Sequence, residues 1–316
     1  MERVVVIGAG QAGFEIARTL RSNAFTGSVT VVGDEESIPY QRPPLSKACL
    51  VGSDGALDTV ALRPRDFYTS HGIDLLCGNR AVAIDRDAAI VDTADGTALG
   101  YDHLILATGT RNRPLPVPGT ELAGVFQLRT VEDARTLSAE LTSAANVVVV
   151  GGGFIGLEVA AAAVHHGARV TIVEWLDRPM ARAVSPTTSA HFVDEHRDHG
   201  VRWLLGTAVE SIIGRSGRVT GVRTAGGSLL EADLVVIGVG VVPNSELAAE
   251  AGLEVDDGVV VDRHLLTADP RISAVGDCAS YDPGEGSARR RLESVQNAVD
   301  HARCVADRLT GRREPF

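Results

Sequence analysis

Lysine is almost absent from this chain. Among 316 residues only Lys47 is a lysine, although lysine and arginine together number 30. Basic residues are also the minority charge, since aspartate and glutamate number 41 and the formal net charge is −11. A chain of this charge repels phosphate groups and anionic lipid, so we expect neither a nucleic-acid partner nor a membrane partner. The one dense basic cluster, residues 289–291, is interpreted as a solvated loop, with a docking patch for an acidic partner as the alternative.

Cysteine is scarce as well. The chain has four, and no two of them have the spacing of metal ligands or of a redox-active dithiol. We therefore expect reduced thiols, a cytoplasmic location and no metal site. The first strand is expected to begin at Arg3, which leaves no room for a signal peptide. The most apolar stretch, residues 147–164, contains four glycines and Glu158, which favours a strand, a turn and a helix over a membrane span.

One pattern is present twice, and its first copy opens the chain. Residues 3–7 form a continuous apolar run, which predicts a strand buried on both faces. The turn Gly8-Ala-Gly-Gln-Ala-Gly13 and a helical pattern through residue 20 follow. A second strand is expected at residues 29–32, with Asp34 just beyond its end.

The second copy lies in the middle of the chain. A strand is expected at residues 147–150, followed by the turn Gly151-Gly-Gly-Phe-Ile-Gly156. A helix over residues 157–166 and a strand over residues 169–173 come next, and Glu174 stands at the tip of that strand.

Both copies have the features of a dinucleotide-binding turn. An acid follows the third glycine by 21 residues in the first copy and by 18 in the second. The first glycine makes the tight turn, the second lets the backbone approach a pyrophosphate, and the third lets helix and strand pack closely. The helix N-terminus then offers unpaired N–H groups to the phosphates. The alternative is two structural strand–helix–strand units that bind nothing.

Two further strands suggest how the domains are divided. Residues 104–107 lead into Thr108-Gly109, and residues 234–237 lead into Gly238-Val-Gly240. These are expected to be the points where the chain changes domain. The fold class predicted is α/β, with two Rossmann-like three-layer domains. Residues 1–112 and 241–316 form the first domain, which is split by the second at residues 113–240.

The order of motifs resembles one family. The stretches that carry the likeness are Pro39–Lys47, Ala107–Thr110, Leu128–Thr130, the second glycine turn continuing to Val159, Ala274–Asp277 and Glu293–Val295. Together they resemble the glutathione-reductase-like pyridine-nucleotide flavoproteins, and more narrowly the putidaredoxin-reductase-like ferredoxin reductases of oxygenase systems. This resemblance implies FAD at the first turn and NADH at the second.

It also implies a set of contact residues for each cofactor. For FAD, Asp34 would hold the adenosine ribose, Arg129 would lie along the cofactor and Asp277 would bond a ribityl hydroxyl. The residues expected at FAD are Gly8, Gly10, Ala12, Gly13, Asp34, Lys47, Ala81, Thr108, Gly109, Arg129, Asp277 and Val295. Those expected at NADH are Gly151, Gly153, Ile155, Gly156, Glu174, Gly238 and Gly240.

The same resemblance implies that Lys47 and Glu158 form a catalytic ion pair beside the reactive nitrogen of the flavin. Hydride arrival leaves the flavin anionic, so a nearby ammonium stabilises the product, and a carboxylate keeps that ammonium charged and in place. The composition supports this role, because a chain that otherwise uses arginine as its cation has its single lysine at this position. The compact ammonium of lysine is not interchangeable with the flat guanidinium of arginine. Chance survival of a single lysine is the alternative.

Glu174 bears on the choice of nicotinamide cofactor. An acid at this strand end accepts from the ribose 2′-hydroxyl of NADH and repels the 2′-phosphate of NADPH. Arg178 and Arg182 follow closely and could bind that phosphate in another pose. The directly placed carboxylate favours NADH.

The sequence departs from the resemblance at three places. It lacks the paired cysteines of disulfide reductases, so a dithiol relay is not expected, and it has Val295 where several relatives place tryptophan. Ferredoxin reductases of this type continue into a third domain, whereas this sequence ends at residues 312–316 where that domain is expected to begin. On this interpretation the domain is missing and the flavin is more exposed than in relatives.

The function predicted is transfer of hydride from NADH to FAD, and of electrons from FAD to a ferredoxin-type iron–sulfur protein. One alternative is an oxidase or dehydrogenase that acts on oxygen or a small molecule through an open flavin face. Another is a flavin-bound interaction or sensor protein with little turnover. The choice between monomer and homodimer stays open.

Overall fold

The computed structural model describes residues 1–52, 57–284, 288–312 and 315–316. The chain forms two compact units, each assembled from separate stretches of sequence. Unit 1 comprises Met1–Gln41, Ala61–Arg111 and Val242–Phe316, and unit 2 comprises Arg42–Val60 and Asn112–Val241. The chain passes between them within the short strands β8 (Thr110–Asn112) and β17 (Val241–Pro243), which pair with each other.

The division expected from the sequence differs from this by one residue at each crossing, because Asn112 and Val241 belong to unit 2, and by one whole segment. Residues 42–60 belong to unit 2, although they fall inside the expected first domain. Their short helices η1 (Pro43–Ser46) and α2 (Ala48–Val51) pack against α4 (Val131–Leu141) and α5 (Phe154–His165). Such packing joins segments about a hundred residues apart, so local sequence pattern does not reveal it.

Unit 1 is built on a parallel sheet of five strands in the order β19-β7-β1-β2-β3. The strands are β1 (Arg3–Ile7), β2 (Ser28–Val32), β3 (Ile73–Leu76), β7 (His103–Leu106) and β19 (Ile272–Ala274). Residues 4–7 of the central strand β1 are all buried. The continuous apolar run therefore marks a strand covered on both faces, as the sequence predicts.

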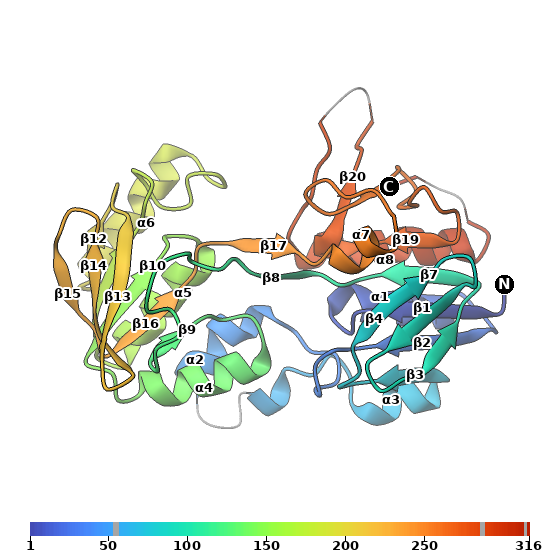
Figure 1. The fold of residues 1–316 in the computed structure, drawn as a ribbon, viewed down its shortest axis with the longest axis horizontal. Coiled ribbons are helices and arrows are strands. Elements are labelled where there is room, and N and C mark those ends of the chain that lie inside the picture. Colours follow the sequence, from blue (N-terminus) through green and yellow to red (C-terminus); the bar gives the residue numbers. More distant parts are fainter. Residues whose placement is uncertain (53–56, 285–287, 313–314) are drawn as a thin grey trace. The chain divides into compact units, whose positions relative to one another are not determined.

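Helices and a second sheet cover the two faces of that parallel sheet (Figure 1). Helices α1 (Gln11–Ser22) and α8 (Val295–Leu309) pack against each other on one face. The antiparallel sheet of β4 (Ala81–Asp85), β5 (Ile90–Thr93) and β6 (Ala98–Gly100) covers the other. The remaining elements of unit 1 are α3 (Arg65–Ser70), α7 (Glu246–Glu250), β18 (Val259–Val261), β20 (Ala279–Tyr281) and the single turn η3 (Gly276–Cys278).

Unit 2 repeats this design. Its parallel sheet has the order β12-β11-β10-β16-β9. The strands are β9 (Val125–Phe126), β10 (Asn146–Val150), β11 (Arg169–Val173), β12 (Arg202–Leu204) and β16 (Leu234–Ile237). The other elements are α6 (Pro186–Asp198), η2 (Leu57–Thr59) and an antiparallel sheet of β13 (Val209–Arg215), β14 (Arg218–Thr224) and β15 (Leu229–Glu231).

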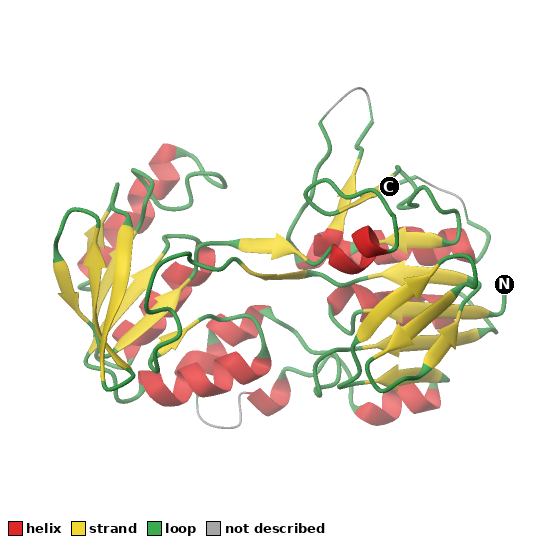
Figure 2. Cartoon of the chain, viewed as in Figure 1, coloured by secondary structure: helices red, strands yellow, loops and turns green. Residues whose placement is uncertain are grey.

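Alternate residues of the unit 2 strands serve different layers, because successive side chains of a strand point to opposite faces. Val148 and Val235 belong to the core cluster shared with Ile212, Val222 and Leu230 of the antiparallel sheet. Helix α5 packs on β10, β11 and β16 (Figure 2). The predicted α/β class, with two Rossmann-like three-layer domains, is confirmed.

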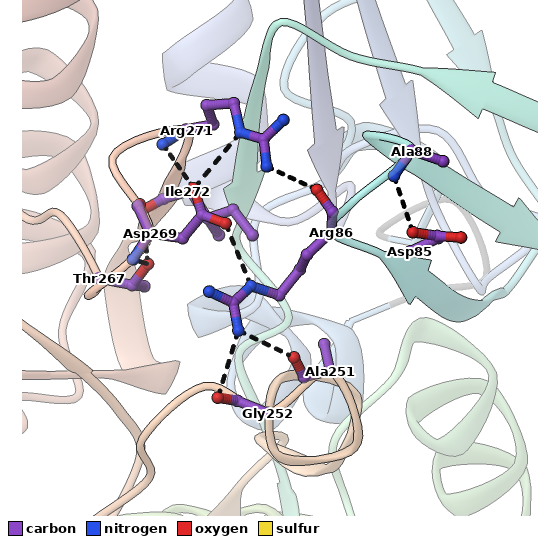
Figure 3. A network of polar contacts seen from close by, with 9 residues as sticks. All are labelled: Asp85, Arg86, Ala88, Ala251, Gly252, Thr267, Asp269, Arg271 and Ile272. Atoms are coloured by element: carbon purple, nitrogen blue, oxygen red, sulfur yellow. Dashed lines mark hydrogen bonds and ion pairs between the residues drawn. The ribbon is translucent and has the colours of Figure 1, made fainter.

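A polar network ties the separate stretches of unit 1 together (Figure 3). Arg86 donates to Asp269 at 3.1 Å and to the carbonyl oxygens of Ala251 and Gly252. Arg271 donates to the carbonyl oxygen of Arg86 and its side chain lies 3.5 Å from the same aspartate. The segment before the inserted unit is therefore fastened to the segment after it.

Candidate functional site

The first glycine turn is compact at its ends and open in its middle. Gly8 has φ +117°, and a Cβ there would lie 2.1 Å from the carbonyl oxygen of Ala107. A Cβ on Gly13 would lie 1.9 Å from the carbonyl oxygen of Gly8. A Cβ on Gly10 would meet nothing within 4 Å. The outer glycines are thus required by the fold itself, whereas the middle one leaves space beside the backbone.

The second turn has the same geometry. Gly151 has φ +108°, and its Cβ would lie 2.4 Å from the carbonyl oxygen of Gly238. A Cβ on Gly156 would lie 2.1 Å from the carbonyl oxygen of Gly151. The nearest atom to a Cβ on Gly153 is the carbonyl oxygen of Gly238, at 4.0 Å. Two turns far apart in sequence therefore share one steric design.

The helices that follow these turns begin without a side-chain cap. Helix α1 starts after Gly10 and α5 after Gly153, and neither has an acid in its first turn. By contrast, Thr130, Ser185 and Ser294 cap α4, α6 and α8 with their hydroxyls. The first N–H groups of α1 and α5 consequently remain available to an anionic ligand, together with the positive end of each helix dipole.

Several residues expected at FAD are brought together in unit 1. A Cβ added to Gly8 would lie 3.2 Å from the backbone nitrogen of Thr108. One added to Gly276 would lie 3.1 Å from the Cβ of Ala12. Thr110 Oγ1 donates to Asp277 Oδ2 at 3.5 Å. The glycine turn, the turn after β7 and the η3 turn therefore meet at the carboxyl ends of β1, β7 and β19, where α/β sheets bind ligands.

Asp34 and Ala81 lie at the neighbouring strand end. The backbone N–H of Asn79 donates to the carbonyl oxygen of Gly33 at 2.9 Å, which holds the start of β4 near the end of β2. Asp34 is exposed, with Arg80 Nη1 at 3.9 Å. The carboxylate of Glu35 accepts from Tyr40 Oη at 2.6 Å. The sequence interpretation missed both Arg80 and Glu35, because it stopped at the first acid after the strand.

The last two residues expected at FAD lie in different units. Arg129 precedes α4 in unit 2, where its N–H donates to Asp133 Oδ2 at 2.9 Å and its carbonyl oxygen accepts from Arg42. Val295 is the first residue of α8 in unit 1 and is half-exposed.

In unit 2 the expected NADH residues are brought to the carboxyl ends of β10, β11 and β16. Glu174 accepts from the N–H of Gly152 at 2.6 Å and from the N–H of Leu176 at 2.7 Å. Gly238 lies against Gly151, as described above. Ile155 is in the first turn of α5 and is 42% exposed. The acid is therefore fixed beside the glycine turn by backbone donors.

The two arginines that could bind a ribose phosphate are placed differently. Arg178 donates to the carbonyl oxygens of Val184 and Ala181 at 2.9 and 2.7 Å, and to Ser189 Oγ at 2.8 Å. Arg182 Nη2 lies 3.6 Å from where a Cβ on Gly240 would be. The guanidinium of Arg178 is thus hydrogen-bonded within its own loop. That of Arg182 lies near Gly240, just after β16.

The ion pair expected between Lys47 and Glu158 is present. Lys47 Nζ lies 2.9 Å from Glu158 Oε1 and also donates to the carbonyl oxygen of Pro43 at 3.2 Å. The other carboxylate oxygen accepts a hydrogen bond from Ser46 Oγ, a partner that the sequence interpretation missed. His166 Nε2 bonds the carbonyl oxygen of Leu50 at 2.7 Å and fastens the same segment to α5.

None of the four cysteines forms a disulfide within the described residues. Burial raises the pKa of Cys49 and of Cys278, and the Cys278 thiol donates to the carbonyl oxygens of Leu106 and Val275. Both therefore behave as packed thiols.

The interpretation of residues 289–291 as a solvated loop is wrong for Arg291. Its side chain is 9% exposed, and it pairs with Asp257 at 3.3 Å and Glu293 at 2.6 Å. Glu293 is a neighbour of Arg291 in sequence, whereas Asp257 is brought to it by the fold.

A buried histidine supports the η3 turn and was also missed. His301 in α8 is fully buried, and its Nδ1 accepts from the N–H of Gly276 at 3.1 Å. Burial lowers the pKa of His301 to about 4, against a small opposing effect of Asp300. The neutral imidazole thus holds the residue that precedes Asp277.

Comparison with known proteins places these features in a family. The family described as pyridine nucleotide-disulphide oxidoreductase matches residues 2–302. This chain belongs to that family. It is therefore an oxidoreductase, and the resemblance found in the sequence is confirmed.

Individual relatives agree with this assignment. The chain is 56% identical to rhodocoxin reductase of Rhodococcus erythropolis, covering 98% of this chain and 72% of that one. It is 43% identical to putidaredoxin reductase of Pseudomonas putida, covering 98% and 75%. A crystal structure of the ferredoxin reductase for the CYP199A2 system from Rhodopseudomonas palustris matches with a TM-score of 0.97 and 46% identity, covering all of this chain and 78% of that one.

Within the part of the chain that the structure describes, no helix has the length and apolar character needed to span a membrane. The same residues contain no group of three or more histidine, cysteine, aspartate or glutamate side chains able to hold a metal ion.

Proposed function

We propose that this oxidoreductase binds FAD in unit 1 and NADH in unit 2, and passes electrons from NADH to a ferredoxin-type iron–sulfur protein in the cytoplasm. The observation that carries the proposal is the repeated glycine turn. Each copy is closed by two sterically required glycines, is open at its middle glycine, and leads into a helix without a side-chain cap.

The residues of unit 1 fit FAD. The N-terminus of α1 offers N–H groups to the pyrophosphate beside Gly10. Asp34 accepts from hydroxyls of the adenosine ribose, and Asp277, placed by the η3 turn, accepts from a ribityl hydroxyl. When bound, FAD supplies a group that takes up a hydride and releases electrons one at a time.

The residues of unit 2 favour NADH over NADPH. Both oxygens of Glu174 are fixed by backbone N–H groups, and their remaining lone pairs accept from the 2′- and 3′-hydroxyls of the adenosine ribose. A 2′-phosphate would meet this fixed carboxylate. Arg178 could bind that phosphate only by breaking its three hydrogen bonds to Val184, Ser189 and Ala181.

Lys47 and Glu158 act at the hydride-transfer step. The ammonium of Lys47 stabilises negative charge that develops as hydride arrives. Glu158 keeps the ammonium charged and positioned, and Ser46 in turn orients Glu158 through its second oxygen. Ser46 and Lys47 of the segment 42–60 and Glu158 of α5 therefore act together, each holding the next in position.

The names of the relatives indicate the electron acceptor. They include reductases of ferredoxin, rhodocoxin and putidaredoxin, and one solved relative is a covalent complex of putidaredoxin reductase with putidaredoxin. That structure covers all of this chain with a TM-score of 0.95 and 42% identity. The cytoplasmic location rests on the four cysteines outside any disulfide in the described residues, which are typical of a reducing compartment.

Anaerobic stopped-flow mixing tests the proposal. The purified protein should carry FAD, and NADH should bleach the flavin much faster than NADPH does. The reduced protein should then be reoxidised rapidly by a ferredoxin and slowly by oxygen. A protein that cannot be reconstituted with FAD, or that prefers NADPH, would overturn the corresponding assignment.

The rates of reoxidation by ferredoxin, oxygen and a quinone also distinguish the alternative functions. Rapid reoxidation by oxygen or a quinone, with a slow ferredoxin reaction, would indicate an oxidase or small-molecule dehydrogenase. Slow reduction with no competent acceptor would indicate a flavin-bound interaction protein.

A further inference from the structure

An exposed tryptophan stands beside the acid of the second nucleotide turn. Trp175 follows Glu174 directly and is 77% exposed, the largest exposed fraction among the large hydrophobic side chains of the described residues. Leaving so large an apolar surface in water costs free energy, which burial of the side chain would recover. The next residue, Leu176, is 39% exposed as well, so exposed apolar surface lies directly beside the carboxylate proposed to bind NADH.

The backbone on both sides of Trp175 is held in place. Glu174 donates its N–H to the carbonyl oxygen of Leu204 at 2.9 Å, and its own carbonyl oxygen accepts from Thr207 at 2.9 Å. The carbonyl oxygen of Leu176 accepts from Gly206 at 2.8 Å. The indole is therefore presented from a fixed backbone at the end of β11, so little ordering is required when a ligand binds it.

The chemistry of NADH places a flat ring next to this position. Its adenine is bonded to the ribose whose hydroxyls Glu174 is proposed to accept, so the base lies within one sugar of that carboxylate. Purine rings stack on aromatic side chains, and each such contact is worth about 1–3 kcal/mol. Tryptophan offers the largest aromatic face for the purpose.

The side chains of Arg178 and Arg182 do not fill the space beside the indole of Trp175. The guanidinium of Arg178 is occupied within its own loop. Arg182 lies at the end of β16, and the strand order puts β10 between that strand and β11.

We propose that Trp175 is a specificity-determining residue whose indole stacks on the adenine of NADH. The inference rests on the proposed function, because it requires NADH in unit 2. It predicts that this chain distinguishes adenine-bearing nicotinamide cofactors from reduced nicotinamide mononucleotide, which lacks adenosine.

Binding of ADP-ribose tests the contact without any redox chemistry. Calorimetry should give a Kd for Trp175→Ala roughly tenfold higher than for the unchanged chain, with Trp175→Phe restoring most of the affinity. The fluorescence of Trp175 should be quenched by ADP-ribose, and Trp175→Phe reports the background from Trp203, the other tryptophan of the chain. Leu229→Ala, which removes a 58% exposed apolar side chain of β15, is the matched control and should bind as the unchanged chain does.

Flavin reduction with two reductants completes the test. Trp175→Ala should raise the KM for NADH roughly tenfold and leave kcat/KM for reduced nicotinamide mononucleotide unchanged. Equal losses with both reductants, or unchanged ADP-ribose affinity, would overturn the stacking role while leaving NADH-dependent flavin reduction in place. A Trp175→Ala protein that binds ADP-ribose normally but reduces ferredoxin slowly would assign the indole to protein docking instead. Failure of the unchanged chain both to bind ADP-ribose and to be reduced by NADH would contradict the proposed function itself.

Discussion

At the scale of single residues, the most informative arrangement is the shared carboxylate of Glu158. One oxygen meets the ammonium of Lys47 and the other accepts from Ser46. Because the ammonium is half-exposed, the pair contributes little to stability. An ion pair that stabilises the fold so little is better explained by a role in catalysis than by a role in folding, and mutation can distinguish the two.

We expect Lys47→Met to slow flavin reduction by NADH roughly 10²-fold, since one preorganised charge opposite a developing anion is worth about that much. The affinity for NAD⁺ and the melting temperature should change little. Arg135→Met, which removes an exposed cation of α4, serves as the control and should reduce at the normal rate. Single-turnover stopped-flow measurements provide the comparison, and an unaffected rate in Lys47→Met would leave that lysine with a structural role only.

At the scale of elements, the two helices that follow the glycine turns differ from the three other helices of more than ten residues in the described part of the chain. The hydroxyl groups of Thr130, Ser185 and Ser294 cap their helices, whereas α1 and α5 begin at glycines. A glycine N-cap costs the helix roughly a few tenths of a kcal/mol relative to a capping hydroxyl. Ligand phosphates restore that loss, so each of these helices is stabilised by its nucleotide.

Gly10→Val should abolish FAD binding and leave the folded protein intact. Gly10 has extended backbone angles that any residue adopts, and its Cβ would meet no protein atom within 4 Å. The added side chain fills only the space assigned to the pyrophosphate. Flavin absorbance after reconstitution measures binding, and circular dichroism measures folding.

Gly13→Ala provides the contrast. Its Cβ would lie 1.9 Å from the carbonyl oxygen of Gly8, so the fold itself should be damaged. If Gly10→Val retained its flavin, the pyrophosphate would have to lie elsewhere.

At the scale of the whole molecule, unit 1 is discontinuous in sequence and must be held together across the inserted unit. The network around Asp269 does this with a carboxylate that is only 6% exposed. Burial alone would raise the pKa of Asp269, but hydrogen bonds from Arg271 and Arg86 hold it below its usual range. The stabilisation from this lowered pKa is present above the unfolded-state value and is lost as pH falls through the folded-state value.

Arg86→Met should therefore lower the free energy of unfolding by about 1–3 kcal/mol at neutral pH. This is less than the full cost of breaking a buried pair, because the arginine is one-third exposed. Arg3→Met removes a comparable pair with Asp102 whose arginine is 55% exposed, and it should cost under about 1 kcal/mol. Urea unfolding of the three proteins checks the ranking, and equal losses would refute the bracing role of Arg86.

Two buried histidines should make stability sensitive to mild acid. Burial lowers the pKa of His103 to about 3 and that of His301 to about 4, both from 6.5. Their stabilisation is complete above pH 6.5, and it is lost as pH falls towards the folded-state values, because only the unfolded chain takes up these protons. Each histidine contributes a slope of roughly 1.4 kcal/mol per pH unit within that window.

His301→Gln should remove one of these slopes, since an amide oxygen can still accept from Gly276 and does not titrate. Denaturant unfolding at pH 6.5 and pH 5 measures the difference, above the range where most carboxylates titrate. We expect the loss of stability between these pH values to be about half of that in the unchanged chain. An unaltered loss would mean that His301 does not remain neutral in the fold.

The repeated strand–turn–helix–strand pattern can be predicted from the amino-acid sequence, because continuous apolar runs and glycine spacings are properties of neighbouring residues. The sequence also identified the acid after each second strand, and through its resemblance the pairing of Lys47 with Glu158. These features depend on local sterics and on motifs that occupy contiguous stretches.

Only the tertiary structure decided which segments come together. It assigned residues 42–60 to unit 2, locked Arg178 within its loop, buried Arg291 between two acids and set His301 under the η3 turn. It also left Trp175 exposed beside a fixed acid. The placement of residues 42–60, the Arg291–Asp257 pair and the His301–Gly276 hydrogen bond depend on contacts between residues distant in the chain, which leave no periodic signal in the sequence. The partners of Arg178 lie within eleven residues of it, but they are reached only through the conformation of an irregular loop.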